Sequence, residues 1–240
     1  MHIVASDETV LLVIKFKVGG DLRFLSHAET LRLFQRACVR AGINIRYSRG
    51  FNPRPRLSLP LPRSVGVESG DELLCLKVNK DIRAQEHKST GDAYGLCSDD
   101  FCTSVAADLS AQLPDGCELV SVNIAPAGAS FQPRSATYVL ILHEEYLNEE
   151  LRARIERLLA SESLNVRRRT GARNSKSKNV DVRPFLTSLE LNGRGIIVEC
   201  RISPAGSIRI DEILNLLGLD ESKLAAPIRR TNVKWKDSES

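Results

Sequence analysis

The residues best suited to chemistry lie between Lys15 and Arg63, where eleven Lys or Arg stand against two acids and give a net charge of +9. Inside this segment, the stretch Tyr47–Arg56 reads YSRGFNPRPR, so its cations alternate with aromatic rings and prolines. Guanidinium groups bind phosphate oxygens in paired hydrogen bonds, and aromatic rings stack on bases. The whole chain carries only +4, so the charge is concentrated here, as is typical of a surface that binds a polyanion, most often RNA.

The prolines make this stretch a stiff loop. Pro53 and Pro55 fix φ at about −65° and favour extended backbone in the residues before them, while glycine at position 50 permits a bend. A stiff loop loses little entropy on binding, which favours a preformed contact surface. The predicted phosphate ligands are Arg23, Arg49, Arg54 and Arg56, and the predicted stacking residue is Phe51 or Tyr47.

A structural interpretation of the same residues stays open. Phe51 could fill the core, and the arginines could pair with carboxylates of residues 64–162, which hold 17 acids and 8 bases. In that case the basic segment would hold the two halves of the chain together. A third interpretation is a scaffold whose basic face binds an acidic protein partner.

Ser26 and His27 stand at a predicted helix start, where free backbone N–H groups and the helix dipole favour an anion. Histidine titrates near neutral pH, so His27 is the candidate for a general acid or base in RNA cleavage or modification. The alternative is a histidine that hydrogen-bonds the helix start or a phosphate. No partner base can be named, so the sequence leaves open whether the protein is an enzyme. Farther along this helix, Arg32, Arg36 and Arg40 recur every four residues and form a cationic stripe.

A second basic tract, Arg167–Arg183, holds seven basic residues and one acid. Its polar, glycine-bearing part, Arg167–Lys178, is expected to be mobile when unbound and to add salt-sensitive affinity for nucleic acid. Asp181 and Arg183 stand two residues apart and predict a salt-bridged strand entry. Alternatively, Arg183 contacts the same anionic ligand as the loop.

Two successive sets of elements must position these residues. Ser26 and Glu29 form a capping box that opens the first helix, and Asn192-Gly193 is a strong hairpin-turn signal. In the first set we expect strands at 11–18, 43–47, 72–78 and 117–124, and helices at 26–41 and 99–113. In the second we expect strands at 137–142, 182–191, 195–202 and 228–235, a further strand at 163–168, and helices from 148 or 149 and at 211–217. The predicted fold class is α+β, with two ferredoxin-like β-α-β-β-α-β halves at 9–125 and 134–237.

The composition indicates the cellular compartment and which cofactors can be expected. No apolar run reaches the 18 or so residues that span a membrane, and the N-terminus lacks a signal-peptide pattern. Six scattered cysteines fit a cytoplasmic protein, and three of them fall at apolar positions of the predicted elements. The cysteine triplet of a radical SAM cluster is absent, and Cys97 and Cys102 with His87 match no usual zinc spacing, so we expect neither metal nor cofactor. The segment Gln85–Asp100 is expected to be a variable polar loop without an assigned role.

Several motifs together resemble the radical-SAM-linked family of uncharacterised domains. They are DLRFLSH at 21–27 with the arginine-rich helix after it, YSRGFNPRPR at 47–56, and the weaker VDVRP at 180–184, SIR at 207–209 and RT at 230–231. The match spans most of residues 10–235. Carried over by position, the shared residues are Arg23, Ser26, His27, Gly50, Phe51, Asn52, Pro53, Pro55, Asp181 and Arg183.

This chain departs from the family pattern at three positions. Arg54 stands where the family commonly has histidine, Arg56 where it has lysine, and Glu29 where it usually has aspartate. Loss of the histidine weakens a paired-histidine mechanism with His27, whereas phosphate binding is unaffected. Family members occur fused to, or encoded beside, radical SAM proteins, and some accompany ribonuclease E/G-type proteins. The resemblance therefore implies an RNA-binding accessory protein for such a partner, and it adds Asn52 to the predicted nucleic-acid site.

Overall fold

The computed structural model describes residues 9–79, 98–170 and 176–236. Within these residues the fold is mixed α/β, with four α-helices and mostly antiparallel sheet. The chain divides into two compact units, the first formed mainly by Met1–Val65 and Ser69–Gln132 and the second by Gly66–Glu68 and Pro133–Lys236. None of the helices described is long and apolar enough to cross a membrane.

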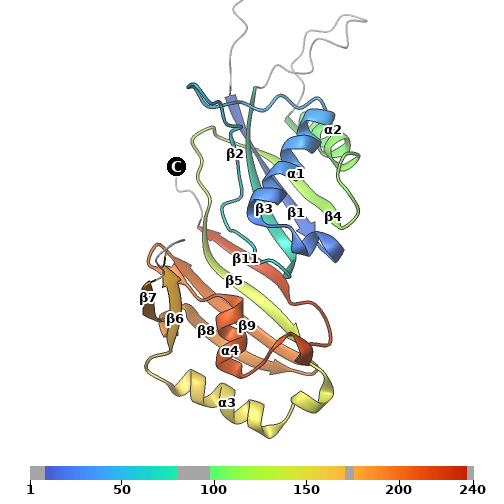
Figure 1. Cartoon of the computed structure of the whole chain (residues 1–240). Helices are drawn as coiled ribbons and strands as arrows, with labels where there is room; N and C mark the ends of the chain where they lie inside the picture. The colour runs from blue at the N-terminus through green and yellow to red at the C-terminus, as the bar shows by residue number, and fades with distance from the viewer. Residues whose placement is uncertain (1–8, 80–97, 171–175, 237–240) are drawn as a thin grey trace, which may run out of the picture. The chain divides into compact units, whose positions relative to one another are not determined.

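Unit 1 is built around a central strand (Figure 1). Its elements are β1 (Thr9–Val18), a 3-10 turn (Gly20–Phe24), α1 (His27–Arg40), β2 (Leu57–Ser58), β3 (Glu68–Asn79), α2 (Ser98–Ser110) and β4 (Cys117–Ala125). Strand β1 pairs antiparallel with both β3 and β4, so that Val13 lies between Cys75 and Asn123. The short strand β2 pairs with β3, which gives the order β2-β3-β1-β4.

The core of unit 1 lies on one face of this sheet. Alternate residues of β1, from Leu12 to Val18, share one buried cluster with Phe34 of α1 and Leu109 of α2. Because side chains alternate across a strand, both helices must cover the same face. The rings of Phe16 and Phe34 meet edge to face, with their centroids 4.6 Å apart.

Helix α1 begins where the sequence predicts. The Ser26 side chain accepts a hydrogen bond from the Glu29 backbone N–H, and the Glu29 carboxylate accepts from the Ser26 backbone at 2.8 Å. This capping box satisfies backbone donors that a helix start leaves free. Phe34, Ala37 and Cys38 are buried, so the arginine stripe faces away from the core.

Unit 2 carries the remaining described strands and helices (Figure 1). Its elements are β5 (Gln132–Ile141), α3 (Glu149–Ala160), β6 (Asn165–Thr170), β7 (Lys176–Asp181), β8 (Leu186–Asn192), β9 (Gly195–Ser203), β10 (Gly206–Ser207), α4 (Ile210–Leu217) and β11 (Arg229–Lys236). Strand β9 pairs antiparallel with β5 on one side and with β8 and β10 on the other, and β11 borders β5. The β8–β9 hairpin turns at Asn192-Gly193, with Gly193 at φ +52°, which confirms the predicted turn.

Two sequence expectations are wrong in detail. Residues 43–47 form no regular strand: they contribute isolated bridges, Ile45 to Val78 and Tyr47 to Pro55, because the chain bends back on itself here. In the tract Arg167–Lys178, expected to be mobile, residues 167–170 and 176–178 belong instead to the paired strands β6 and β7, in which Arg168 lies opposite Lys178; residues 171–175 lie outside the described part of the chain. Apolar contact explains that order, since Val166 and Val180 pack against the core of unit 2. The predicted loop Gln85–Asp100 lies outside the described residues up to position 97, as do His87 and Cys97.

Candidate nucleic-acid interface

The Tyr47–Arg56 loop is a closed turn that is hydrogen-bonded to β3 at its base. Main-chain hydrogen bonds join Ser48 N to Arg54 O at 2.8 Å and Arg56 N to Arg46 O at 2.7 Å, so the two arms of the loop pair. The Ser48 hydroxyl also accepts from Arg54 N at 2.9 Å. Below the turn, Arg46 N donates to Lys77 O and Lys77 N donates to Arg56 O. The loop is therefore held at its base by a rigid strand, which preforms its tip.

The tip presents one aromatic ring to solvent. Phe51 is fully exposed, at 104% of its reference surface, and Tyr47 is 46% exposed. Asn52 beside it is also exposed. The interpretation of Phe51 as a core residue is thus wrong, because no apolar surface among the described residues covers it. A fully exposed ring on a loop is available for stacking.

Three exposed arginines lie within five residues of this ring in the sequence. Arg49, Arg54 and Arg56 are exposed, and no hydrogen bond or ion pair joins their guanidinium groups to the part of the chain that the structure describes. The loop arginines are therefore not neutralised by described carboxylates of residues 64–162. Their charge remains available for an anion.

The other predicted site residues of unit 1, namely Arg23, Ser26 and His27, lie at the start of α1 and in the turn before it. Arg23 donates to Gly20 O at 2.8 Å, and its guanidinium lies 4.3 Å from the centre of the Phe24 ring. Ser26 is engaged in the capping box. His27 opens α1, and its Nδ1 atom is buried without a hydrogen-bond partner among the described residues. Neither Ser26 nor His27 is bonded to the loop.

Arg183 belongs to unit 2 and has a structural role. Its guanidinium donates to the carbonyl oxygens of Leu159 at 2.8 Å, Ser161 at 2.9 Å and Leu186 at 3.0 Å. Two of these carbonyls end α3, where a cation is favoured by the helix dipole. Arg183 is thus occupied by main-chain acceptors and not poised for a ligand.

The predicted Asp181–Arg183 salt bridge is replaced by a main-chain arrangement. The Asp181 carboxylate accepts from Leu164 N at 2.8 Å and from Arg183 N at 3.0 Å. These hydrogen bonds from the backbone of Leu164 and of Arg183 lower the pKa of Asp181 below its usual value, with a further contribution from the Arg183 charge. The pair therefore fixes the β7 end and the start of β8.

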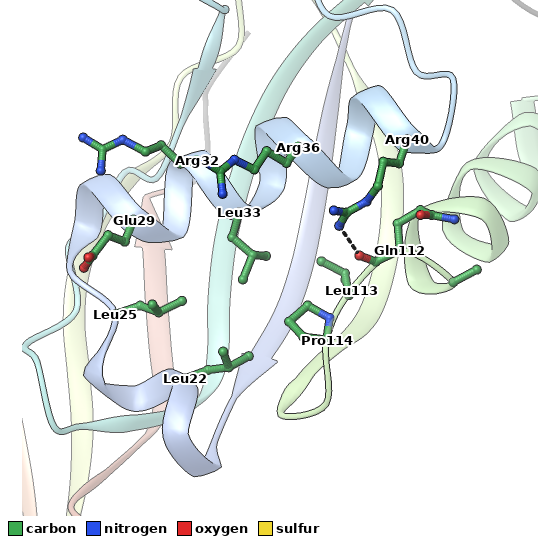
Figure 2. Close-up of a pocket in the computed structure, with 11 residues that line it drawn as sticks. Leu22, Leu25, Glu29, Arg32, Leu33, Arg36, Arg40, Gln112, Leu113 and Pro114 are labelled. Carbon is green, nitrogen blue, oxygen red and sulfur yellow. Dashed lines mark hydrogen bonds between the residues drawn. The ribbon is translucent and has the colours of Figure 1, made fainter.

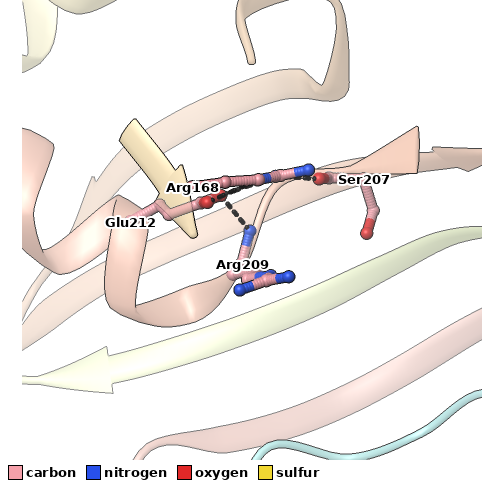
Figure 3. Close-up of polar contacts among 4 residues, drawn as sticks. All are labelled: Arg168, Ser207, Arg209 and Glu212. Atoms are coloured by element: carbon pink, nitrogen blue, oxygen red, sulfur yellow. Dashed lines mark hydrogen bonds and ion pairs between the residues drawn. The ribbon is translucent and has the colours of Figure 1, made fainter. Parts of the chain in front are cut away.

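Arg168 of the second basic tract contacts α4 and the strand before it (Figure 3). It forms a two-pronged ion pair with Glu212 of α4, at 2.7 and 2.8 Å, and donates to Ser207 O at 2.6 Å. Burial raises the pKa of Glu212, but hydrogen bonds from Arg168 and from Arg209 N outweigh it, so the net pKa is lowered. This contact ties the β6–β7 hairpin to α4 and leaves Arg168 unavailable to nucleic acid.

A groove that the sequence did not predict lies along α1 (Figure 2). It has a volume of about 590 Å³, a floor of aliphatic residues and a rim of arginines. The floor comprises Leu22, Leu25, Leu33, Leu113 and Pro114, and the rim comprises Arg32, Arg36 and Arg40 with Glu29. The four-residue spacing of the arginines was visible in the sequence. The floor was not, because its residues come from three separate segments.

The described residues contain no group of three or more His, Cys, Asp or Glu arranged to hold a metal ion. The cysteines among them behave as apolar residues. Burial raises the pKa of the Cys38 and Cys200 thiols to about 12 and that of Cys75 to about 11. A thiol with so high a pKa is a poor nucleophile.

The sequence of this chain matches an established bacterial protein family. The chain belongs to the family described as "uncharacterized protein conserved in bacteria (DUF2344)", whose pattern matches residues 12–93 and 98–214. No curated protein is significantly similar to it. One solved structure with a similar arrangement is a chain of a Cbf5-Nop10-Gar1 complex, at 13% identity and a TM-score of 0.40. The alignment covers 92% of this chain and 48% of that one, so this chain spans about half the length of its structural neighbour.

Proposed function

We propose that this protein is a cytoplasmic RNA-binding accessory protein that presents RNA to a partner enzyme through the Tyr47–Arg56 loop. The observation that carries the proposal is the fully exposed Phe51 ring among Arg49, Arg54 and Arg56, whose guanidinium groups have no partner in the described structure. Rings that stack on bases and cations that meet phosphates are the two components of single-strand binding. The partner enzyme is a radical SAM or ribonuclease E/G-type protein, by the motif resemblance of the loop and of the α1 start.

We further propose that each unit is a ferredoxin-like domain. In unit 1 the chain order β-α-β-β-α-β combines with the strand order β2-β3-β1-β4. In unit 2 the order β8-β9-β5-β11 repeats this plan, with the β6–β7 hairpin inserted after α3. Such sheets leave loops at their edges free for recognition, as the Tyr47–Arg56 loop is here.

Removing two loop cations tests phosphate binding. Arg54→Ala with Arg56→Ala should weaken binding to a single-stranded RNA oligonucleotide and flatten the salt dependence, with the slope of log K against log salt reduced by about 1.4 to 1.8. Fluorescence anisotropy over a salt series measures both quantities. The matched control is Arg194→Ala with Arg201→Ala, which removes the same charge from exposed positions of unit 2. Equal losses in both double variants would mean that net charge, not the loop, binds RNA.

Removing the ring tests stacking. Phe51→Ala should cost about 1–3 kcal/mol of RNA-binding free energy without changing the salt slope, because stacking releases no counterions. The control is Val120→Ala, which trims another exposed apolar side chain of unit 1. An unchanged affinity in Phe51→Ala would remove the ring from the interface.

A further inference from the structure

The groove along α1 differs in chemistry from the loop and calls for a different ligand. Its floor is aliphatic and none of its lining residues is aromatic, so it offers no platform on which a base could stack. Figure 2 shows Leu33 projecting from α1 toward Leu22 and Pro114, with the arginines along the helix above it. An apolar floor with a charged rim is the anatomy of a protein–protein contact.

The rim is positively charged in net terms. Arg36 has no partner among the described residues, and Arg32 and Arg36 are exposed. Glu29 is the one acid that lines the groove, and its carboxylate is held by the Ser26 hydroxyl at 2.6 Å and the Ser26 backbone at 2.8 Å. Glu29 stays ionised, but one carboxylate against three guanidinium groups leaves the rim with a net positive charge. The groove therefore favours an acidic ligand.

Both walls of the groove are fixed before any ligand arrives. Arg40 donates to Gln112 O at 2.8 Å, which joins α1 to the segment after α2. Gly19 N donates to Gly116 O at 2.8 Å, which joins the turn before α1 to the start of β4. Arg63 donates to the carbonyl oxygens of Leu22 and Arg23 and so holds the 3-10 turn that carries the floor. A preformed groove loses little entropy on binding.

We propose that this groove binds an acidic amphipathic helix of a partner protein. Arg32, Arg36 and Arg40 span nine residues of α1, and the eight steps between the first and the last cover about 12 Å along its axis. Acidic side chains four residues apart on a second helix repeat at the same spacing, and leucines on its adjoining face fit the aliphatic floor. The partner enzyme thereby binds at a site separate from the RNA-binding loop. This proposal does not depend on RNA binding by the loop.

A peptide selection on the full chain tests the proposal. The probe is a display library of short helical peptides with leucines fixed on one face and three flank positions, four residues apart, varied among Glu, Gln and Lys. Wild-type protein should enrich Glu at these positions, and Arg36→Glu should shift the enrichment toward Lys. The selected Glu peptide should bind Arg36→Glu about tenfold more weakly than wild type, and its Glu→Lys version should recover the affinity.

Controls separate this site from general charge. Arg49→Glu makes the same charge change on the loop, so it should leave peptide binding unaltered while weakening RNA binding; circular dichroism confirms that both variants are folded. Absence of enrichment, or equal loss of peptide binding in Arg36→Glu and Arg49→Glu, overturns the proposal. So does displacement of the peptide by an RNA oligonucleotide in the Arg54→Ala, Arg56→Ala variant, because the groove would then be a nucleic-acid site.

Discussion

The arginines of this chain show that identical side chains take different roles according to what lies within reach. Arg63 and Arg183 each donate to several backbone carbonyls, and Arg168 pairs with a carboxylate. Arg49 and Arg54 lack such partners in the described residues. In the sequence, the arginines with structural partners and those without both appear only as members of basic segments. Only the structure separates the arginines that hold the fold from those that remain available for a ligand.

Arg168 is expected to stabilise unit 2 through its pairing with Glu212, whose side chain is 9% exposed. Arg168→Met should lower the free energy of unfolding by about 2–3 kcal/mol, because it leaves a mostly buried carboxylate without its cation. Adding Glu212→Leu should restore part of the loss, because it removes the unpaired carboxylate but also the acceptor of the Arg209 N–H. Urea unfolding at neutral pH, followed by circular dichroism, measures the change. The control Arg167→Met alters the exposed neighbour on β6 and should be close to neutral; if it costs as much as Arg168→Met, the ion pair is not the cause.

Local signals were sufficient where the partners are close in sequence. The Ser26–Glu29 capping box and the Asn192-Gly193 turn are formed as predicted, because each depends on residues within one turn. The Arg168–Glu212 pair could not be predicted, since its members lie 44 positions apart. The sequence does not decide whether Phe51 is exposed for the same reason: whether a ring is covered depends on distant segments, not on its neighbours.

At the scale of elements, the turn after β1 is connected to the start of β4 by one close backbone contact. Gly116 has φ +88°, and a Cβ added there would lie 2.7 Å from Gly19 O, closer than side chains pack. Gly116→Ala should therefore destabilise unit 1 by about 1–3 kcal/mol. It should also weaken binding of the selected acidic peptide, because the Gly19–Gly116 contact fixes one side of the groove.

The matched control for this change is Gly128→Ala. A Cβ at Gly128 meets nothing within 4 Å, and its φ is not in the left-handed region. This variant should change the free energy of unfolding by less than about 0.5 kcal/mol. Thermal unfolding of both variants decides the matter: equal melting temperatures would show that the Gly116 backbone is not strained by a side chain.

At the scale of the whole molecule, charge is unevenly distributed along the chain. The segment Lys15–Arg63 carries +9 while the chain sums to +4, so the remainder is acidic by 5. The described structure leaves much of the loop's charge unpaired, and it uses several acids elsewhere to fix helix starts and turns. The carboxylates of Glu29, Asp181 and Asp220 each accept hydrogen bonds from nearby backbone or hydroxyl groups. The two signs of charge thus differ in their surroundings: the cations of the loop are exposed, whereas these anions fix local structure.

The hydrogen-bonded carboxylates predict how the free energy of unfolding depends on pH. Hydrogen bonds lower the pKa of Glu29 and Glu212 below 4.5 and that of Asp181 and Asp220 below 3.8. A carboxyl whose pKa is lower in the folded state stabilises the fold above its unfolded pKa and loses that effect as pH falls through the folded pKa. The urea midpoint should therefore be insensitive to these groups above about pH 5 and fall steeply below about pH 4. Glu212→Gln should make that acid decline shallower, whereas Glu190→Gln, at an exposed position, should leave it unchanged. A decline equally steep in Glu212→Gln would show that the Arg168 pair does not contribute to it.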